Sequence, residues 1–203
     1  MLFLSFFLGF SASYIGSITP SMLNITATKI SLEKGKKTAT QFAFGVSFIV
    51  LFQAFIGLFF LKTINQNPVI LETIQKVATV IFIVLSIVFF RKAIQKQQEI
   101  PTQKPTKNGF LTGAGLSTVN MFSIPFFCGV AAVFKMYNWL ELELLSIIIF
   151  SVGSSLGTFL ILYNYVSLAE KIRPKIAKFS TFLNYVLSAI TGIVAIISLI
   201  KML

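Results

Sequence analysis

The chain has 203 residues, of which 56% are hydrophobic, and its mean hydropathy of +0.87 excludes an ordinary soluble domain. The net charge of +11 is divided among short gaps between apolar stretches, an arrangement that does not suit a nucleic-acid-binding surface. The absence of histidine and aspartate excludes Ser–His–Asp triads and carboxylate–histidine metal sites, so we expect neither an enzyme nor a bound metal or cofactor.

Six apolar stretches predict six membrane-crossing helices, and together they indicate a single all-α integral membrane domain over residues 1–203. In chain order they are Leu2–Thr28, Ala39–Leu61, Ile74–Phe90, Phe110–Phe134, Leu142–Leu168 and Phe179–Ile200. A helix needs about 20 mostly apolar residues to cross the hydrocarbon core of a bilayer. The third stretch is the shortest, and it reaches that length only if flanking residues such as Lys76 extend toward the interface.

Basic residues alternate between the gaps and predict a topology. Most of the 17 lysine and arginine residues fall in the first, third and fifth gaps. The positive-inside rule places those gaps in the cytoplasm. We therefore expect a multi-pass protein of the cytoplasmic (inner) membrane with both termini outside.

A polar linker at residues 93–108, which contains Pro101 and Pro105, divides the chain into two halves, residues 1–92 and 109–203. Each half has three predicted spans. Because three is odd, the second half enters the membrane from the side opposite to the first. This 3+3 arrangement is typical of inverted-topology repeats.

Each half has a proline in its first span, Pro20 in the first and Pro125 in the fourth. A proline inside a helix removes one backbone hydrogen bond and frees a carbonyl one turn earlier. Irregular backbone is tolerated in a bilayer only where it is buried or lines a cavity. We therefore expect helices 1 and 4 to be broken, with the breaks facing each other. Small residues on spans two and five, and glycine pairs such as Gly153-x-x-x-Gly157, predict close helix packing.

Short motifs give the chain a resemblance to a known family. They are Thr19-Pro20-Ser21-Met22, then Ser31-Leu32-Glu33-Lys34-Gly35, Ala39 and Gly45, and Asn120-Met121-Phe122 in the fourth span. They resemble the Pro-Gly-Pro, Ser-Leu-x-x-Gly and Asn-Pro-Lys elements of the lysine exporter (LysE/RhtB) family of amino-acid efflux proteins. The resemblance implies a proton-driven secondary transporter with six spans.

The chain departs from that family at specific positions. Ser21 and Met22 replace the Gly-Pro of the first element, and Met121 and Phe122 replace the Pro-Lys of the second. An acidic residue of many relatives in span five aligns with Thr158. The sequence has no Asp or His, and every Glu lies in a loop or at a span edge, as Glu143 does; hydroxyl and amide groups do not change charge at working pH. We therefore expect export that does not depend on an intramembrane carboxylate.

A substrate site is expected at the two breaks, because helix N-termini suit a carboxylate and unwound carbonyls suit an ammonium group. The candidate substrate-binding residues are Pro20, Ser21 and Asn24 at the first break, Asn120, Ser123 and Pro125 at the second, and Gln53, Ser154, Thr158 and Asn164 on spans two and five. Each polar member also fits an interhelical hydrogen bond.

The sequence favours a secondary transporter that exports amino acids or similar small zwitterionic metabolites by alternating access. The alternatives are a non-transporting accessory or assembly subunit and a small-solute channel. The expected partners are a small-molecule substrate and the lipid bilayer, with no nucleic acid. The sequence leaves open the substrate, the coupling ion and whether the protein is a monomer or a homo-oligomer.

Overall fold

The computed structural model describes residues 2–18, 21–65, 108–120 and 122–171, with eleven further single positions between 83 and 94 and between 188 and 196. The chain forms two compact units, one from Met1–Thr63 and Thr102–Arg173, the other from Ile64–Pro101 and Pro174–Leu203. The third and sixth predicted spans and the linker lie almost entirely outside the described residues, and so do Thr19, Pro20 and Met121.

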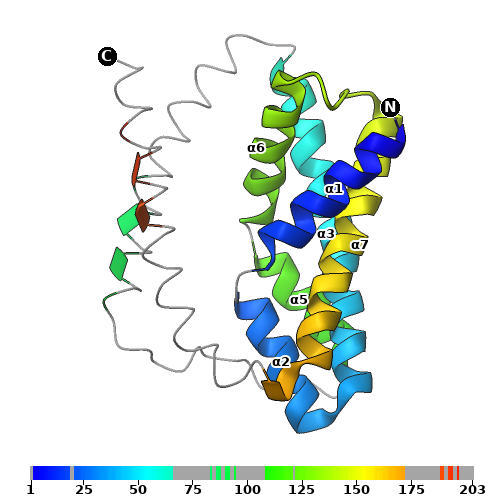
Figure 1. Ribbon diagram of the computed structural model, residues 1–203, viewed down its shortest axis with the longest axis vertical. Helices are drawn as coiled ribbons and strands as arrows, with labels where there is room; N and C mark the ends of the chain where they lie inside the picture. Colours follow the sequence, from blue (N-terminus) through cyan, green and yellow to red (C-terminus); the bar gives the residue numbers. More distant parts are fainter. Residues whose placement is uncertain are drawn as a thin grey trace. The chain divides into compact units, whose positions relative to one another are not determined.

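Every element that the structure describes is an α-helix (Figure 1). The helices are α1 (Leu2–Gly16), α2 (Met22–Lys34), α3 (Lys36–Asn65), α5 (Gly109–Val119), α6 (Ser123–Met136) and α7 (Leu144–Ser167). By length and composition, α3 and α7 can each cross a membrane. The pair α5 and α6, bent by 66°, provides a third crossing if it is one span. Helix α1 is apolar but shorter, with 15 residues.

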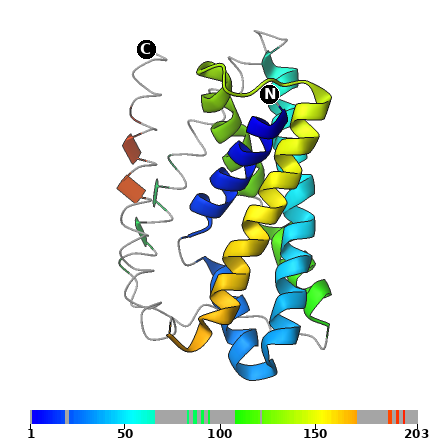
Figure 2. The same ribbon diagram turned by 45° about the vertical axis from the view of Figure 1, so that its right-hand side comes forward.

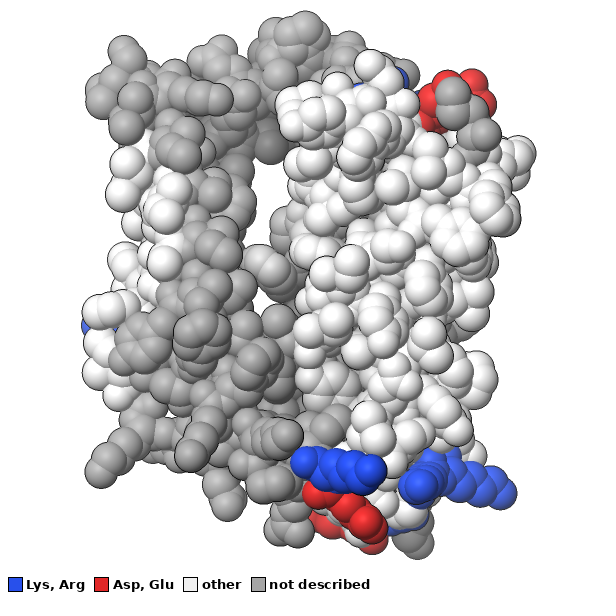
Figure 3. All heavy atoms as spheres, in the orientation of Figure 1, with Lys and Arg blue, Asp and Glu red and all other residues white. Residues whose placement is uncertain are grey.

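The described spans of the first unit run between two distinct ends. The N-terminus of α1, the end of α3 and the α6–α7 connection lie at one end, and the α2–α3 turn, the start of α5 and the end of α7 lie at the other (Figures 1 and 2). Lysine side chains gather at the second end (Figure 3), where Lys34, Lys36, Lys37 and Lys171 stand at helix termini. Lys62 and Lys135 lie in the last turns of α3 and α6, at the first end.

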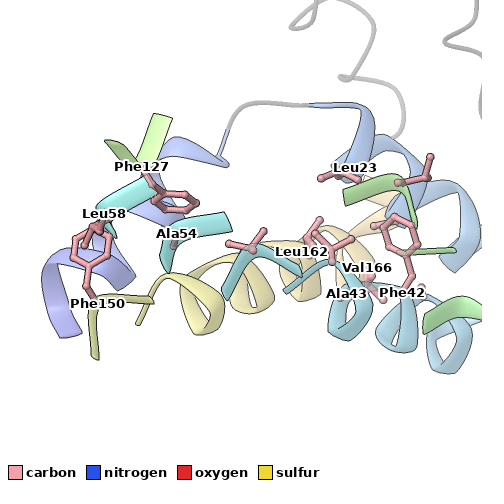
Figure 4. Packing of buried hydrophobic residues seen from close by; sticks show 14 of the residues in the cluster. Leu23, Phe42, Ala43, Ala54, Leu58, Phe127, Phe150, Leu162 and Val166 are labelled. Carbon is pink, nitrogen blue, oxygen red and sulfur yellow. The ribbon is translucent and has the colours of Figure 1, made fainter. Parts of the chain in front are cut away.

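Local sequence explains where the helices of this unit begin and end. Gly35 separates α2 from α3 with φ 87 and ψ 161, a conformation that is essentially restricted to glycine. Asn108 caps α5, because its side-chain oxygen accepts hydrogen bonds from the backbone N–H groups of Phe110 and Leu111. The core between these helices is apolar (Figure 4), and its members include Leu23, Phe42, Ala43, Ala54, Leu58, Phe127, Phe150, Leu162 and Val166.

Glycines allow α1 and α7 to pack with their backbones in contact. A Cβ atom on Gly9 would lie 2.1 Å from the carbonyl oxygen of Phe150, and one on Gly153 would lie 2.2 Å from that of Phe6. Gly157 is also in close contact with the α1 backbone, at 2.4 Å. The predicted close approach at the Gly153 and Gly157 pair is therefore confirmed, and its partner is the first span.

Helices α3 and α5 pack in the same way. A Cβ atom on Gly113 would lie 2.1 Å from the carbonyl oxygen of Phe42, and one on Gly45 would lie 2.1 Å from that of Phe110. A Cβ atom on Gly109 would lie 2.2 Å from a carbonyl of α3. Each of the four helices thus uses a Phe-x-x-Gly element, and each glycine meets the carbonyl of the partner's phenylalanine. Each contact joins the two halves of the chain, α1 of the first half with α7 of the second and α3 of the first half with α5 of the second.

Two serine pairs extend this correspondence. In the first unit, Ser155 Oγ donates a hydrogen bond of 2.8 Å to the carbonyl oxygen of Ser47, and these residues are 108 positions apart, as are Gly45 and Gly153. In the second unit, Ser86 Oγ donates to the carbonyl oxygen of Ser188, and Ser188 Oγ donates to that of Ser86, both at 3.1 Å. Such contacts are expected where equivalent residues meet at a local two-fold axis.

Candidate substrate site at two helix breaks

The first break lies between the end of α1 at Gly16 and the start of α2 at Met22, and side chains from two helices bond the described backbone there. Asn24 on α2 donates a hydrogen bond of 2.8 Å from its side-chain nitrogen to the carbonyl oxygen of Ser17. The Tyr165 hydroxyl on α7 donates one of 2.7 Å to the carbonyl oxygen of Ile18. Ser21 caps α2, accepting from the backbone N–H of Asn24 at 3.4 Å. Carbonyls freed at the end of α1 are therefore satisfied inside the protein, as an apolar surrounding requires.

The second break lies between the end of α5 at Val119 and the start of α6 at Ser123, and a side chain of α3 bonds the backbone beside it. Gln53 donates from its side-chain nitrogen to the carbonyl oxygens of Ser117 at 2.8 Å and Asn120 at 3.3 Å. The side-chain nitrogen of Asn120 donates to Ser123 Oγ at 3.1 Å across the break. Helix α6 begins at Ser123, and its N-cap residue Phe122 makes no side-chain cap hydrogen bond.

The fourth span is broken near Pro125, as expected, and the structure refines the position of the break. Helix α5 ends at Val119, and α6 already includes Pro125, whose side chain is exposed. The physical reason is that proline is tolerated in the first turn of a helix, where its missing N–H would have no helical partner. Asn120, rather than Pro125, therefore marks the break.

The two broken spans lie against each other close to their breaks. Gly16 is the last residue of α1, and a Cβ atom there would lie 2.5 Å from the ring of Phe126 in the first turns of α6. Any side chain larger than hydrogen at Gly16 would displace that ring. The structure therefore brings the end of α1 together with the start of α6.

The candidate residues on α7 contact α1. Ser154 Oγ donates to the carbonyl oxygen of Gly9 at 3.3 Å, and the hydroxyls of Thr158 and Ser13 are 2.5 Å apart. The side-chain nitrogen of Asn164 donates to the Tyr14 hydroxyl at 3.1 Å (residues 150 positions apart in the chain). These contacts are interhelical hydrogen bonds of the kind that the sequence left open as the other interpretation. Their participation in substrate binding stays a prediction.

The side-chain oxygen of one candidate residue, Gln53, has no hydrogen-bond donor among the described residues. Gln53 is 5% exposed, and its side-chain oxygen accepts no hydrogen bond within the described part of the chain. The hydroxyl of Thr26, which is 1% exposed, likewise has no hydrogen-bond partner in that part of the chain. Leaving a buried acceptor without a donor is costly in an apolar surrounding. Because the nitrogen of Gln53 is bound at the second break, its oxygen is held beside that break and can accept from an N–H donor there.

Sequence reasoning missed Tyr165, Tyr14, Ser13 and Ser117, which complete these contacts. The available signal was helical spacing, because Tyr165 follows Thr158 by two turns and so lies on the same face of α7. Ser117 Oγ donates to the carbonyl oxygen of Val46 at 3.4 Å, so α3 and α5 are also bonded through the residue before the second break.

Comparison with known protein families identifies the family of this chain. A model of the LysE type translocator matches residues 14–201, which include both breaks and every described helix from α2 onward. The chain belongs to the LysE type translocator family. Searches of curated proteins and of solved structures give no match. As a member of this family of transporters, the protein is a multi-pass membrane transport protein rather than an enzyme.

The glutamates of this translocator that the structure describes lie at helix ends, away from both breaks. Glu33 is in the last turn of α2, 3.9 Å from Lys29, and both side chains are substantially exposed. Glu143 precedes α7, and Glu170 follows it. Among the described residues, therefore, the groups at the breaks are amides, hydroxyls and backbone.

Proposed function

We propose that this translocator exports amino acids or similar small zwitterionic metabolites across the cytoplasmic membrane by alternating access. The observation that carries the proposal is the meeting of two broken spans, where Gly16 at the end of α1 lies against Phe126 of α6. Broken spans present helix termini and free backbone groups at membrane depth. Family membership supports transport, and the breaks supply groups for a zwitterion.

The polar groups at the second break suit the two charges of such a substrate. The N-terminus of α6 has no side-chain cap, and its helix dipole with the N–H group of Ile124 favours a carboxylate, since Ser123 and Phe126 donate to the backbone and Pro125 has no N–H. The spare side-chain oxygen of Gln53, together with break carbonyls, suits an ammonium group. In this proposal Asn120 and Ser123 fix the shape of the break, and Ser21 and Asn24 do so at the first break.

We further propose that the chain is a 3+3 inverted repeat with both termini outside. Reciprocal Phe-x-x-Gly contacts and the Ser47–Ser155 and Ser86–Ser188 pairs support a two-fold relation between the halves. The lysines at the α2–α3 turn and after α7 support a cytoplasmic location for that end. If the two halves have equivalent structures, each half can adopt the conformation of the other. This exchange exposes one substrate site to each side of the membrane in turn.

The test is flux through the purified protein in proteoliposomes loaded in turn with radiolabelled amino acids. The proposal expects saturable efflux of at least one amino acid, competition by an unlabelled analogue, and a large reduction in Asn120→Ala. Thr118→Ala, an exposed position on α5, is the matched control and should transport normally. Flux that rises without saturation would instead indicate a channel. No protein-dependent flux of any amino acid would contradict the proposal and favour an accessory subunit.

A further inference from the structure

Equivalent positions of the two halves differ at the breaks. Gly57 on α3 and Tyr165 on α7 are separated by the 108 positions that relate Ser47 to Ser155. A Cβ atom on Gly57 would lie 2.8 Å from the carbonyl oxygen of Ile124, so α6 packs directly on α3 there. At the corresponding place on α7 stands a tyrosine, which reaches the first break. The two breaks are therefore held by different side chains at different helical turns.

The hydrogen bonds at the first break form a connected set across three helices. Tyr165 is 7% exposed, and its hydroxyl bonds the Ile18 carbonyl and also interacts with the side chain of Asn24. Asn24, 1% exposed, bonds the Ser17 carbonyl. Two successive carbonyls of the break are thereby fixed to α2 and α7. A movement of α1 relative to α7 at this point must separate the Tyr165 hydroxyl from Ile18.

We infer, on the basis of the proposed function, that Tyr165 and Asn24 are positioning residues that hold the backbone of the first break against α7 and α2. Their hydrogen bonds to the carbonyl oxygens of Ile18 and Ser17 break during transport. The second break is held separately by Gln53 from α3. The hydrogen bonds of each break can therefore be weakened without weakening those of the other. Tyr165 acts through the backbone of Ile18, and Asn24 through that of Ser17, rather than by binding substrate.

Hydrogen–deuterium exchange of the full-length protein in lipid nanodiscs tests this without substrate. Tyr165→Phe keeps the ring and removes the hydroxyl, and Tyr163→Phe is the matched control, because Tyr163 is 44% exposed on the same helix and stacks on Phe159. We expect exchange about fivefold faster across residues 10–26 in Tyr165→Phe, the effect of losing one hydrogen bond. Residues 113–128, around the second break, should exchange as in the wild type.

Gln53→Leu should give the opposite pattern, with faster exchange at residues 113–128 and unchanged exchange at 10–26. If Tyr165→Phe does not fold, Asn24→Ala removes the Ser17 bond and should reproduce its pattern. Unchanged exchange at the first break, equal acceleration at both breaks, or the same effect in Tyr163→Phe would each overturn the inference.

Transport gives a second readout that simple loss of active protein does not change. The ratio of net efflux to substrate exchange does not depend on the active fraction, because both scale with it. Tyr165→Phe should change this ratio about fivefold and leave the half-saturating substrate concentration unaltered. A wild-type protein that transports no amino acid would contradict the proposed function. The hydrogen–deuterium exchange measurements would still decide whether Tyr165 holds the backbone of the first break. An unchanged ratio in a transporting variant would overturn the inference.

Discussion

The side-chain nitrogen of Gln53 lies 2.8 Å from the carbonyl oxygen of Ser117, so a residue of the second span bonds the last turn of α5. The backbone carbonyl oxygen of Asn120, at the break, accepts a second hydrogen bond of 3.3 Å from the same nitrogen. One side chain thus gives an additional hydrogen bond to two carbonyls of the broken span, which also accept from the backbone N–H groups of Asn120 and Ser123.

Gln53→Leu should therefore lower both stability and transport. Two carbonyls each lose one hydrogen bond, worth about 0.5–1.5 kcal/mol of unfolding free energy apiece. We also expect at least about tenfold slower amino-acid efflux, since the substrate site loses an acceptor. The control is Gln41→Leu, at an exposed position on the same helix. Equal loss of thermal stability in both variants, measured in detergent, would contradict the assigned role.

Two glycines of α5 should respond oppositely to alanine. A Cβ atom on Gly113 would lie 2.1 Å from the Phe42 carbonyl oxygen, whereas one on Gly115 would meet nothing within 4 Å. Gly113→Ala must push α3 and α5 apart, and we expect little folded protein. Gly115→Ala should be neutral or stabilising by up to about 1 kcal/mol, because alanine favours the helix. Fluorescence-detected gel filtration after heating measures both. Similar behaviour of the two variants would rule out the reciprocal packing.

The hydroxyls of Ser13 and Thr158, 2.5 Å apart and buried, should be energetically coupled. In a double-mutant cycle with Ser13→Ala and Thr158→Val, we expect an interaction free energy of about 0.6 kcal/mol, typical of hydrogen bonds between membrane helices. Additive single-variant effects on unfolding in mixed micelles would show that the contact contributes nothing.

The topology can be tested with single cysteines in a Cys128→Ser background. Asn138 lies in the α6–α7 turn and Lys37 at the start of α3, at opposite ends of the first unit. We expect a membrane-impermeant maleimide to label Asn138→Cys in intact cells and Lys37→Cys only in inverted vesicles. The reverse pattern would place both ends on the other side and contradict the positive-inside assignment.

Sequence reasoning reached the described apolar helices and the existence of breaks because apolar runs and prolines act locally. It placed the fourth-span break near Pro125, and the structure puts the break just before this residue, since Pro125 fits inside the first turn of α6 and helix α5 ends at Val119. It singled out neither Tyr163 nor Tyr165. Two aromatic residues in one apolar helix differ only in what packs beside them, and that depends on spans distant in the sequence.

The repeated Phe-x-x-Gly element is visible in the sequence, but the sequence does not show which helices it brings together. Glycine spacing predicts that helices approach closely, and it does not say which helices pair. The pairing of α1 with α7 and of α5 with α3 follows from how the chain is arranged in three dimensions. The candidate site depends on this pairing, because Gln53 and Tyr165 reach the breaks from helices that are remote in sequence.

The last prediction concerns energy coupling. The family resemblance implies proton-driven export, yet the described residues at both breaks are amides, hydroxyls and backbone, which carry no titrating charge near neutral pH. Glu33 and Glu170 stand at helix ends on the lysine-rich side, and Glu33 is 3.9 Å from Lys29 at an exposed position. We therefore expect an imposed pH gradient, with sodium absent, not to stimulate amino-acid uptake into inverted vesicles. Glu33→Gln and Glu170→Gln should transport like the wild type. Strong stimulation that either variant abolishes would show that a glutamate carries the proton.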